Sequence, residues 1–165
     1  MKNISRLIIL SLLIFMLISA FAGCLNPPGI ESVQQRFYKN QTDIQTVTTF
    51  LIDTYANGDN VYIDRADGTM SVTHRTDNRY VTEKVKIEDL AVLHAIDCLI
   101  GGEQYNRIRK SDNTVLFLQW NRFFGAGCGV LFIIDGSEKP SIQYLTELVP
   151  IADTGWYYYI SDPDA

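Results

Sequence analysis

Hydrophobic residues with helical spacing run through positions 30–55. They recur at alternating steps of three and four residues, interrupted only at Asn40, which places them on one stripe of an amphipathic helix. The members of the stripe are Ile30, Val33, Phe37, Ile44, Val47, Leu51 and Tyr55. Gly58 follows as a stop signal, because glycine readily adopts the left-handed conformation beyond a helix. The spacing predicts one long N-terminal helix, which the polar run KNQTD at 39–43 would bend or interrupt.

The rest of the chain carries the alternation and the turn signals of strands. The runs VYID and TMSVT flank Ala66, Asp67 and Gly68, which predicts a hairpin, and YVTEKV adds a further short strand. A second, shorter helix is predicted at 88–99, ended by Gly101 and Gly102. Later strands are predicted at 105–110, 114–121, 128–134, 142–146 and 156–160.

Two of these runs, TVLFLQW and CGVLFII, are apolar almost without alternation. This favours central strands that are covered on both faces, whereas the more polar YNRIRK and SIQYLT fit better toward an edge. The pattern therefore predicts an α+β fold. Its antiparallel sheet, of about five to seven strands, packs against the long N-terminal helix and the shorter second helix.

An apolar run of 15 residues at 7–21 precedes this domain. It follows Lys2 and Arg6 and is interrupted only by Ser11 and Ser19. A membrane-spanning helix needs about 20 apolar residues, so the run is marginal as a span. A positive start, an apolar centre and small residues before a break are the layout of a secretory signal peptide.

The tetrapeptide FAGC at 21–24 resembles the lipobox of bacterial lipoprotein precursors. The resemblance implies that Ala22 and Gly23 precede a cut and that Cys24 becomes an N-terminus joined to diacylglycerol, although Phe21 stands where leucine is usual. It divides the chain into a removed signal peptide (1–23), a lipidated cysteine with a short linker (24–29) and a single α+β domain (30–165). Acylation would hold that domain at the extracytoplasmic face of the cell membrane.

The C-terminal third carries a second resemblance. The stretch GVLFIIDGSEKPSIQYLTELVPIADTGWYYYISD is similar to the tail of uncharacterised small lipoproteins from Firmicutes, in which a DG…P turn precedes a final WYYY strand. This resemblance implies a Gram-positive surface setting and no particular activity.

Removal of the signal peptide makes the chain more acidic. The whole chain has 14 basic and 19 acidic residues, and the loss of Lys2 and Arg6 leaves 12 against 19, a formal charge of −7. An acidic surface repels phosphate backbones and anionic headgroups. Nucleic acid is therefore not an expected partner, and membrane attachment is expected from the lipid.

Cys98 and Cys128 are the cysteines left once Cys24 is lipidated. They form either a disulfide, which persists in exported proteins, or two buried thiols. Cys128 with His74 or His94 as base would be a thiol nucleophile. Together, His74, His94, Cys98 and Cys128 have the donor types of a Cys2His2 zinc site, but the usual closely spaced ligand pairs are absent. We therefore expect neither a metal nor a cofactor.

Paired carboxylates are a second route to catalysis, because glycosidases use two acids across a cleft. The available pairs are Asp64 with Asp67, Glu88 with Asp89, and Asp97 with Glu103. Nothing in the sequence selects among them. Most belong to turns or helix starts, where acids cap backbone amides.

Aromatic residues suggest a binding surface. Strand geometry sends Trp156 and Tyr158 to one face and Tyr157 and Tyr159 to the other, so one pair is expected to be exposed if the other packs on the core. A further cluster lies at a turn and consists of Trp120, Phe123 and Phe124. Core and cross-strand packing is the alternative use of these rings.

The sequence thus predicts a lipid-anchored, extracytoplasmic α+β domain that acts as a non-catalytic binding or accessory module. Its partner would be a protein or a cell-wall sugar. The alternative is a small cell-surface hydrolase that uses Cys128 or a carboxylate pair. The specific partner and the oligomeric state stay open at this stage.

Overall fold

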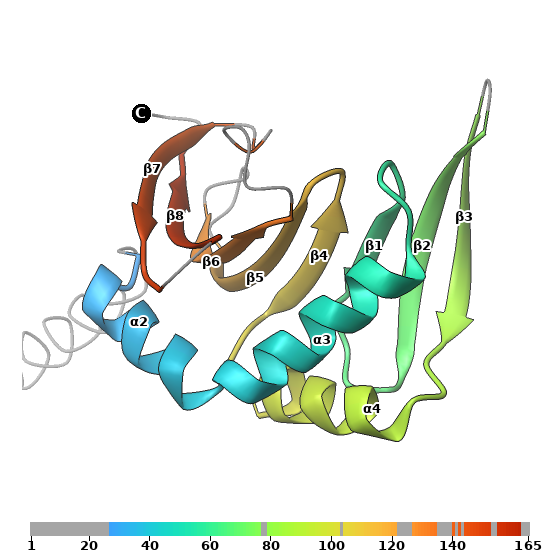
Figure 1. Ribbon diagram of the computed structural model, residues 1–165, viewed down its shortest axis with the longest axis horizontal. Helices are drawn as coiled ribbons and strands as arrows, with labels where there is room; N and C mark the ends of the chain where they lie inside the picture. The colour runs from blue at the N-terminus through green and yellow to red at the C-terminus, as the bar shows by residue number, and fades with distance from the viewer. Residues whose placement is uncertain are drawn as a thin grey trace, which may run out of the picture.

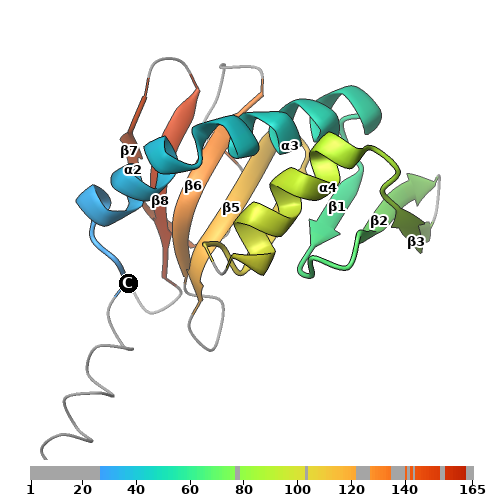
Figure 2. The same ribbon diagram turned by 90° about the horizontal axis from the view of Figure 1, so that it is seen from below.

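A computed structural model describes residues 27–76, 79–102, 104–121, 127–134, 140, 142, 144–152 and 155–162. These residues form one antiparallel sheet with helices packed on one of its faces, as Figures 1 and 2 show. The predicted α+β class is confirmed, and the sheet has eight strands where fewer were expected. The predicted signal peptide and Cys24 lie outside the described residues. Within the described part of the chain, no helix combines the length and the apolar character needed to cross a bilayer.

The N-terminal segment forms two helices, α2 (Ile30–Lys39) and α3 (Gln41–Thr54), so the prediction of one long helix is wrong. Asn40 ends the first and precedes the second, with φ −111° and ψ 17°. Its backbone N–H donates to the carbonyl oxygens of Arg36 and Phe37, and its side-chain amide donates to the Arg36 oxygen over 2.8 Å. The interruption therefore falls within the polar run that was expected to bend the helix.

The second predicted helix is present as α4 (Leu90–Ile96), which continues into a π-helical turn, η1 (Asp97–Gly101). Asp89 caps its start, because one carboxylate oxygen accepts from the backbone N–H groups of Ala91 and Val92 at 2.8 and 3.2 Å. Gly102 closes the π turn by donating its N–H to the Asp97 oxygen over 2.8 Å.

All strand pairs are antiparallel, in the order β3-β2-β1-β4-β5-β6-β8-β7. The strands are β1 (Asn60–Ile63), β2 (Thr69–Thr76), β3 (Arg79–Lys86), β4 (Arg107–Ser111), β5 (Thr114–Asn121), β6 (Gly127–Ile133), β7 (Leu145–Pro150) and β8 (Trp156–Ser161). The predicted hairpin joins β1 to β2.

Two strands differ from the prediction. The polar β4 lies in the middle of the sheet and not at its edge, because its alternate residues Ile108 and Lys110 are buried while Arg107 and Arg109 are exposed. β7 lies at the edge of the sheet but shares only Leu145 and Thr146 with the predicted strand at 142–146, because it starts at Leu145 and continues to Pro150.

The main core lies between the helices and the sheet. Trp156, the first residue of β8, belongs to this core, and the centroid of its ring lies 5.1 Å from that of Phe37 and 4.8 Å from that of Phe132. A second cluster covers the opposite face of β5, β6 and β8. Its buried members are Leu116, Leu131, Ile133 and Tyr159. The expectation that TVLFLQW and CGVLFII are covered on both faces is thus confirmed.

Candidate functional site

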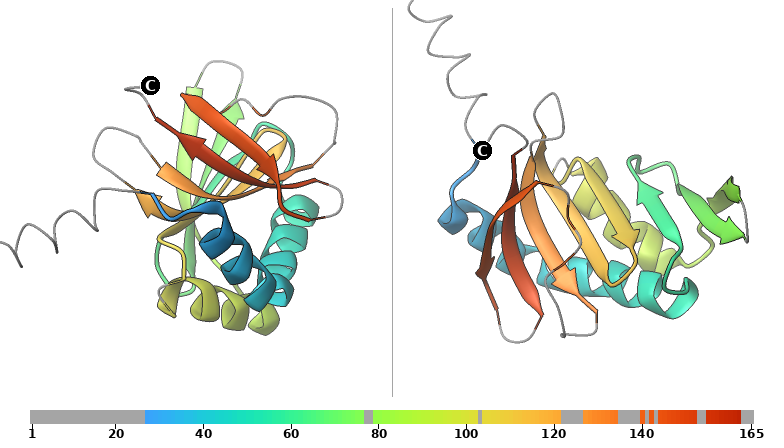
Figure 3. Two further views of the ribbon diagram at one scale, coloured as in Figure 1. Left: turned by 90° about the vertical axis from the view of Figure 1, so that its left-hand side faces the viewer. Right: turned by 90° about the horizontal axis from the view of Figure 1, so that it is seen from above.

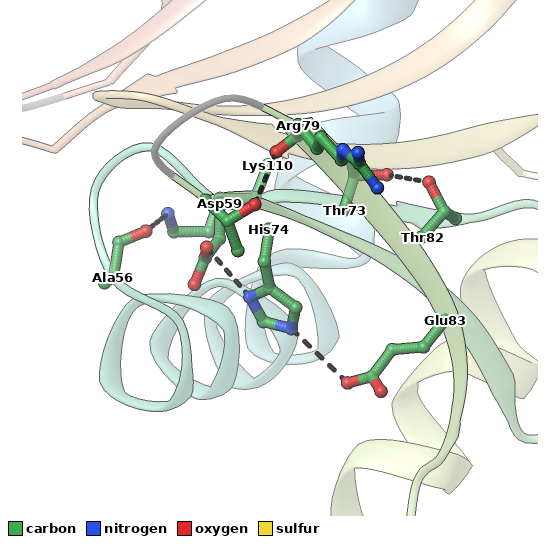
Figure 4. Close-up of polar contacts among 9 residues, drawn as sticks. Ala56, Asp59, Thr73, His74, Arg79, Thr82, Glu83 and Lys110 are labelled. Atoms are coloured by element: carbon green, nitrogen blue, oxygen red, sulfur yellow. Dashed lines mark hydrogen bonds and ion pairs between the residues drawn. The ribbon is translucent and has the colours of Figure 1, made fainter.

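Polar side chains from several elements surround His74 on β2 (Figure 4). Its Nδ1 atom lies 3.0 Å from Asp59 Oδ1, and its Nε2 atom lies 3.3 Å from Glu83 Oε1. Asp59 immediately precedes β1, and Glu83 belongs to β3. The register pairs Asn60 with Thr73 and His74 with Val81, so the three strands bring these side chains together on the helix side of the sheet.

The two carboxylates fix the protonation of His74. The hydrogen bond to Asp59 raises the pKa of the imidazole above 6.5, and the bond to Glu83 adds to the effect. Carboxylates only accept, so both ring nitrogens donate when the ring is an imidazolium. Both ring nitrogens are thus engaged by carboxylates, and the geometry of His74 is that of a hydrogen-bonded link between Asp59 and Glu83.

Lys110 of β4 lies on the same side of the sheet and is fully buried. Its Nζ atom donates to the carbonyl oxygen of Ala56 over 2.8 Å, just beyond the C-terminal end of α3. Carbonyl groups at a helix C-terminus carry partial negative charge, which favours a cation there. Burial lowers the pKa of the ammonium, while Asp59 and Asp112 act in the opposite sense.

This group of residues fastens the end of α3 to four strands. Tyr55 extends it by directing its hydroxyl toward Met70 Sδ at 3.7 Å, and burial raises the pKa of that phenol, with Glu83 and then Asp59 adding to the rise. A hydrogen bond of 2.8 Å between the hydroxyls of Thr73 and Thr82 closes the β2–β3 pair on the other face (Figure 4). The arrangement is a structural clasp, which we call the His74 clasp.

The two cysteines within the described residues are free. Cys98 on η1 points to the preceding helical turn, with its sulfur 3.8 Å from His94 Nε2, whereas Cys128 is fully buried in β6. The structure therefore contains two thiols and not the disulfide that was one of our two expectations. Burial raises the pKa of both thiols, that of Cys128 to about 12, so each is held in its less reactive, protonated form.

The residues of the proposed nucleophile and zinc sites are not brought together. His74 is bonded to Asp59 and Glu83, and His94 contacts Cys98, so neither histidine serves Cys128. Among the described residues, no group of three histidine, cysteine or acidic side chains has an arrangement that could hold a metal ion.

The acidic residues of the predicted carboxylate pairs lie in a turn, at a helix cap or on the surface, as far as the structure describes them. Asp67 Oδ1 accepts from the backbone N–H and the hydroxyl of Thr69 at 3.0 and 2.7 Å, and the hydroxyl bond lowers the pKa of this carboxyl. Asp64 lies 4.0 Å from Arg107, and Asp89 is the helix cap described above. Glu88 and Asp97 are exposed, and Glu103 lies outside the described residues.

The expectation of an exposed aromatic pair on β8 is wrong. Trp156 and Tyr158 belong to the main core, and Tyr159 is only 3% exposed within the second cluster, where Tyr157 is half-buried. The reason is that apolar residues of the edge strand, including Leu145 and Leu148, cover this face. Trp120 is half-buried against the main core, and Phe123 and Phe124 lie outside the described residues.

Sequence reasoning missed Asp59, Glu83 and Lys110. The signal for Lys110 was present, because alternation in RIRKS places it on the same face as Ile108. Pairing of TMSVT with YVTEKV would have brought His74 toward Glu83. Comparisons with known protein families, with characterised proteins and with solved structures found no match.

Proposed function

We propose that this chain is a lipid-anchored extracytoplasmic lipoprotein whose domain binds another molecule without catalysing a reaction. The observation that carries the proposal is the lipobox-like FAGC, which ends at Cys24 only six positions before α2. The linker is also tied to the sheet, because Tyr158 donates its hydroxyl to the Pro28 oxygen over 3.3 Å. An anchor at Cys24 would therefore hold the body close to the bilayer.

The state of the reactive groups supports binding over hydrolysis. The thiol of Cys128 is buried and has no histidine partner, and His74 has both ring nitrogens engaged. A thiol nucleophile needs a nearby base or a positive environment to form its thiolate. We therefore place the function of this domain on its surface.

Intact-mass analysis of the protein isolated from a bacterial membrane fraction tests the anchor. The expected mass is that of residues 24–165 plus a diacylglyceryl group, with the lipid mapped to Cys24. Cys24→Ala is expected to abolish the lipid and the cut, whereas Cys98→Ala, the matched control, is expected to leave both unchanged. A mature chain that retains Met1, or that starts at another residue without lipid, contradicts the proposal.

A further inference from the structure

The face of the sheet opposite the helices is covered only over β5 to β8. On β3, β2, β1 and β4 its side chains are exposed or half-buried, and Figure 3 (right) looks onto this side, with the helices behind the sheet. We call this the open face. Its residues are Asn60, Tyr62, Thr69, Ser71, Thr73, Arg75, Tyr80, Thr82, Lys84, Lys86, Arg107, Arg109 and Ser111.

The strand register aligns these side chains in rows across the four strands. Ser71 is paired with Lys84 on one side and with Tyr62 on the other, and Tyr62 is paired with Arg109. The Arg109 guanidinium carbon lies 5.2 Å from the centre of the Tyr62 ring. Since neighbouring strands are about 4.8 Å apart, this row places two cations about 14 Å from each other, with two hydroxyls between them.

The charged strand residues of the open face are all basic. Five of its residues are basic and none is acidic, although acidic residues outnumber basic ones in the chain, 19 to 14. The basic residues are Arg75, Lys84, Lys86, Arg107 and Arg109. Asp64, which follows β1, brings a carboxylate 4.0 Å from Arg107. A surface that served solubility alone would intersperse both signs of charge.

Protection of an edge strand explains only part of this charge. Lysines on an exposed edge discourage pairing with other chains, and this accounts for Lys84 and Lys86 of β3. Arg107 and Arg109 belong to β4, which is hydrogen-bonded on both sides, to β1 and β5. Their exposure on an interior strand therefore requires another explanation.

We propose that the open face binds an acidic polysaccharide. Arginine and lysine pair with carboxylate oxygens, and the serine, threonine, asparagine and tyrosine side chains between them hydrogen-bond to sugar hydroxyls. An acidic polysaccharide carries well-separated carboxylates with hydroxyl groups between them. This spacing matches the Lys84–Ser71–Tyr62–Arg109 row, which has a cation at each end and two hydroxyls between. This inference rests on the proposed function, because it names the partner class of the anchored binding module.

Two other polyanions fit less well. Single-stranded nucleic acid stacks successive bases on several free aromatic faces, but Arg109 lies over the ring of Tyr62, which leaves Tyr80 as the strongly exposed ring among the residues of the open face. A bilayer surface is disfavoured by position, because the linker contacts β8, whereas β4 and β3 lie three and six strands away from it. At about 4.8 Å per strand, the basic residues of β4 lie about 14 Å from β8, where the linker contacts the sheet, and those of β3 lie about 29 Å from it.

Binding of the full-length protein, kept in detergent, to immobilised polygalacturonate tests the proposal, with neutral dextran as the control polymer. We expect binding to polygalacturonate that weakens as salt is raised, and none to dextran. The double variant Lys84→Ser/Arg109→Ser should weaken binding about tenfold or more, since it removes two charge-assisted contacts. The matched double variant Lys39→Ser/Arg79→Ser removes two exposed charges outside the open face and should change binding less than about twofold.

Loss of binding has to be separated from loss of folding. The unfolding midpoint of each variant is measured, and a second pair, Arg75→Ser/Lys86→Ser, should reproduce the effect if the first pair unfolds. Equal weakening by the matched control, or no binding of the parent protein to polygalacturonate, overturns the proposal.

Preferential binding to oligothymidylate also overturns the proposal. So does a Cys24→Ala chain that binds phosphatidylglycerol vesicles and does not bind the polysaccharide. The assay does not depend on the lipid, so a missing lipid with intact binding contradicts the anchor alone. A lipidated protein that does not bind contradicts the open-face assignment alone.

Discussion

At the scale of single residues, His74 carries the clearest dependence on pH. Its two carboxylate partners, Asp59 first and then Glu83, raise the pKa of the folded state above the ordinary 6.5. The stabilisation is therefore fully present below pH 6.5 and is lost as the pH rises through the folded-state pKa. We predict that the difference in unfolding free energy between the parent protein and His74→Gln shrinks as the pH is raised from about 5 to about 9.

Nuclear magnetic resonance titration of the His74 ring gives the pKa directly. Asp59→Asn should lower this pKa further than Glu83→Gln, in keeping with the order of the two causes. His94→Gln changes the other histidine of the chain and should leave the His74 titration unchanged. A pKa at or below 6.5 in the parent protein would contradict the clasp.

Lys110 raises the question of whether its charge or its aliphatic stem stabilises the fold. Its side chain is fully buried, and its ammonium has one hydrogen bond, to the Ala56 oxygen. Lys110→Met keeps the stem and removes both that bond and the cost of burying the charge, so we predict a stability change within about 1 kcal/mol. Lys110→Ala also opens a cavity and should cost about 2–4 kcal/mol.

Urea denaturation at neutral pH compares the two Lys110 variants. Arg109→Ala, on the exposed neighbour, serves as the control and should fall within about 0.5 kcal/mol of the parent protein. Equal destabilisation by methionine and alanine would mean that the ammonium contact, and not the stem, stabilises this position.

At the scale of elements, the β5–β6 pair depends on the absence of a side chain at Gly129. The register shifts between Leu118 and Trp120, opposite this glycine, and a Cβ there would overlap with the Phe117 carbonyl oxygen. The obstructing atom is backbone, so it cannot rotate away. We predict that Gly129→Ala costs about 3 kcal/mol or more in thermal or urea unfolding. Gly29→Ala, at the N-cap of α2, where a Cβ meets nothing within 4 Å, should cost no more than about 1 kcal/mol, from the weaker cap alone.

The elements themselves were largely predictable, because most of them have one buried face. The hairpin at 66–68, the second helix and the strands at 114–121, 128–134 and 156–160 all followed from periodicity and turn residues. The single long helix did not form, because the Asn40 amide bonds back to the Arg36 carbonyl and ends the first helix. Helical spacing alone cannot distinguish a continuous stripe from two helices that share it.

Contacts between elements were the part that the sequence could not supply. Alternation along β8 correctly separated Trp156 and Tyr158 from Tyr157 and Tyr159. It could not show that β7 residues cover the second pair, since this depends on which strand lies at the edge. The same limit hid the His74 clasp, whose members come from the end of α3, the segment before β1 and the strands β2, β3 and β4, and the open face, whose members come from four strands.

At the scale of the whole molecule, the sheet is divided between two environments. Its β5–β8 half is covered on both faces, and the linker contacts the molecule there through Pro28 and Tyr158. In the other half, the helices cover one face of β2, β1 and β4, whereas β3 is exposed on both faces over most of its length, and the opposite side of these four strands presents the open face. Attachment and recognition would thus use opposite ends of one sheet, so that an anchored domain could reach a polymer beyond the bilayer surface.

The helix layer and the sheet are joined by non-covalent contacts, namely the apolar core and the polar contacts of the His74 clasp, and thiol labelling tests whether a disulfide adds to them. Cys98 is half-buried on η1 and Cys128 is fully buried in β6, and both are free. A maleimide reagent, with peptide mapping of the full chain, should label Cys98 in the native protein, and faster as the pH rises, because burial raises the pKa of this thiol. Cys128 should react at least about 100-fold more slowly, since it becomes accessible only when the core opens.

Denaturant without reductant should make both thiols reactive, and Cys98→Ser should abolish native labelling. A disulfide closing a loop of about 30 residues would stabilise the fold by roughly 3–4 kcal/mol, so with both thiols free the helix–sheet contact depends on non-covalent contacts. Cys128 is itself a member of that core. Labelling that requires prior reduction would instead show a Cys98–Cys128 bridge, and with it a covalent bond between the helix layer and the sheet.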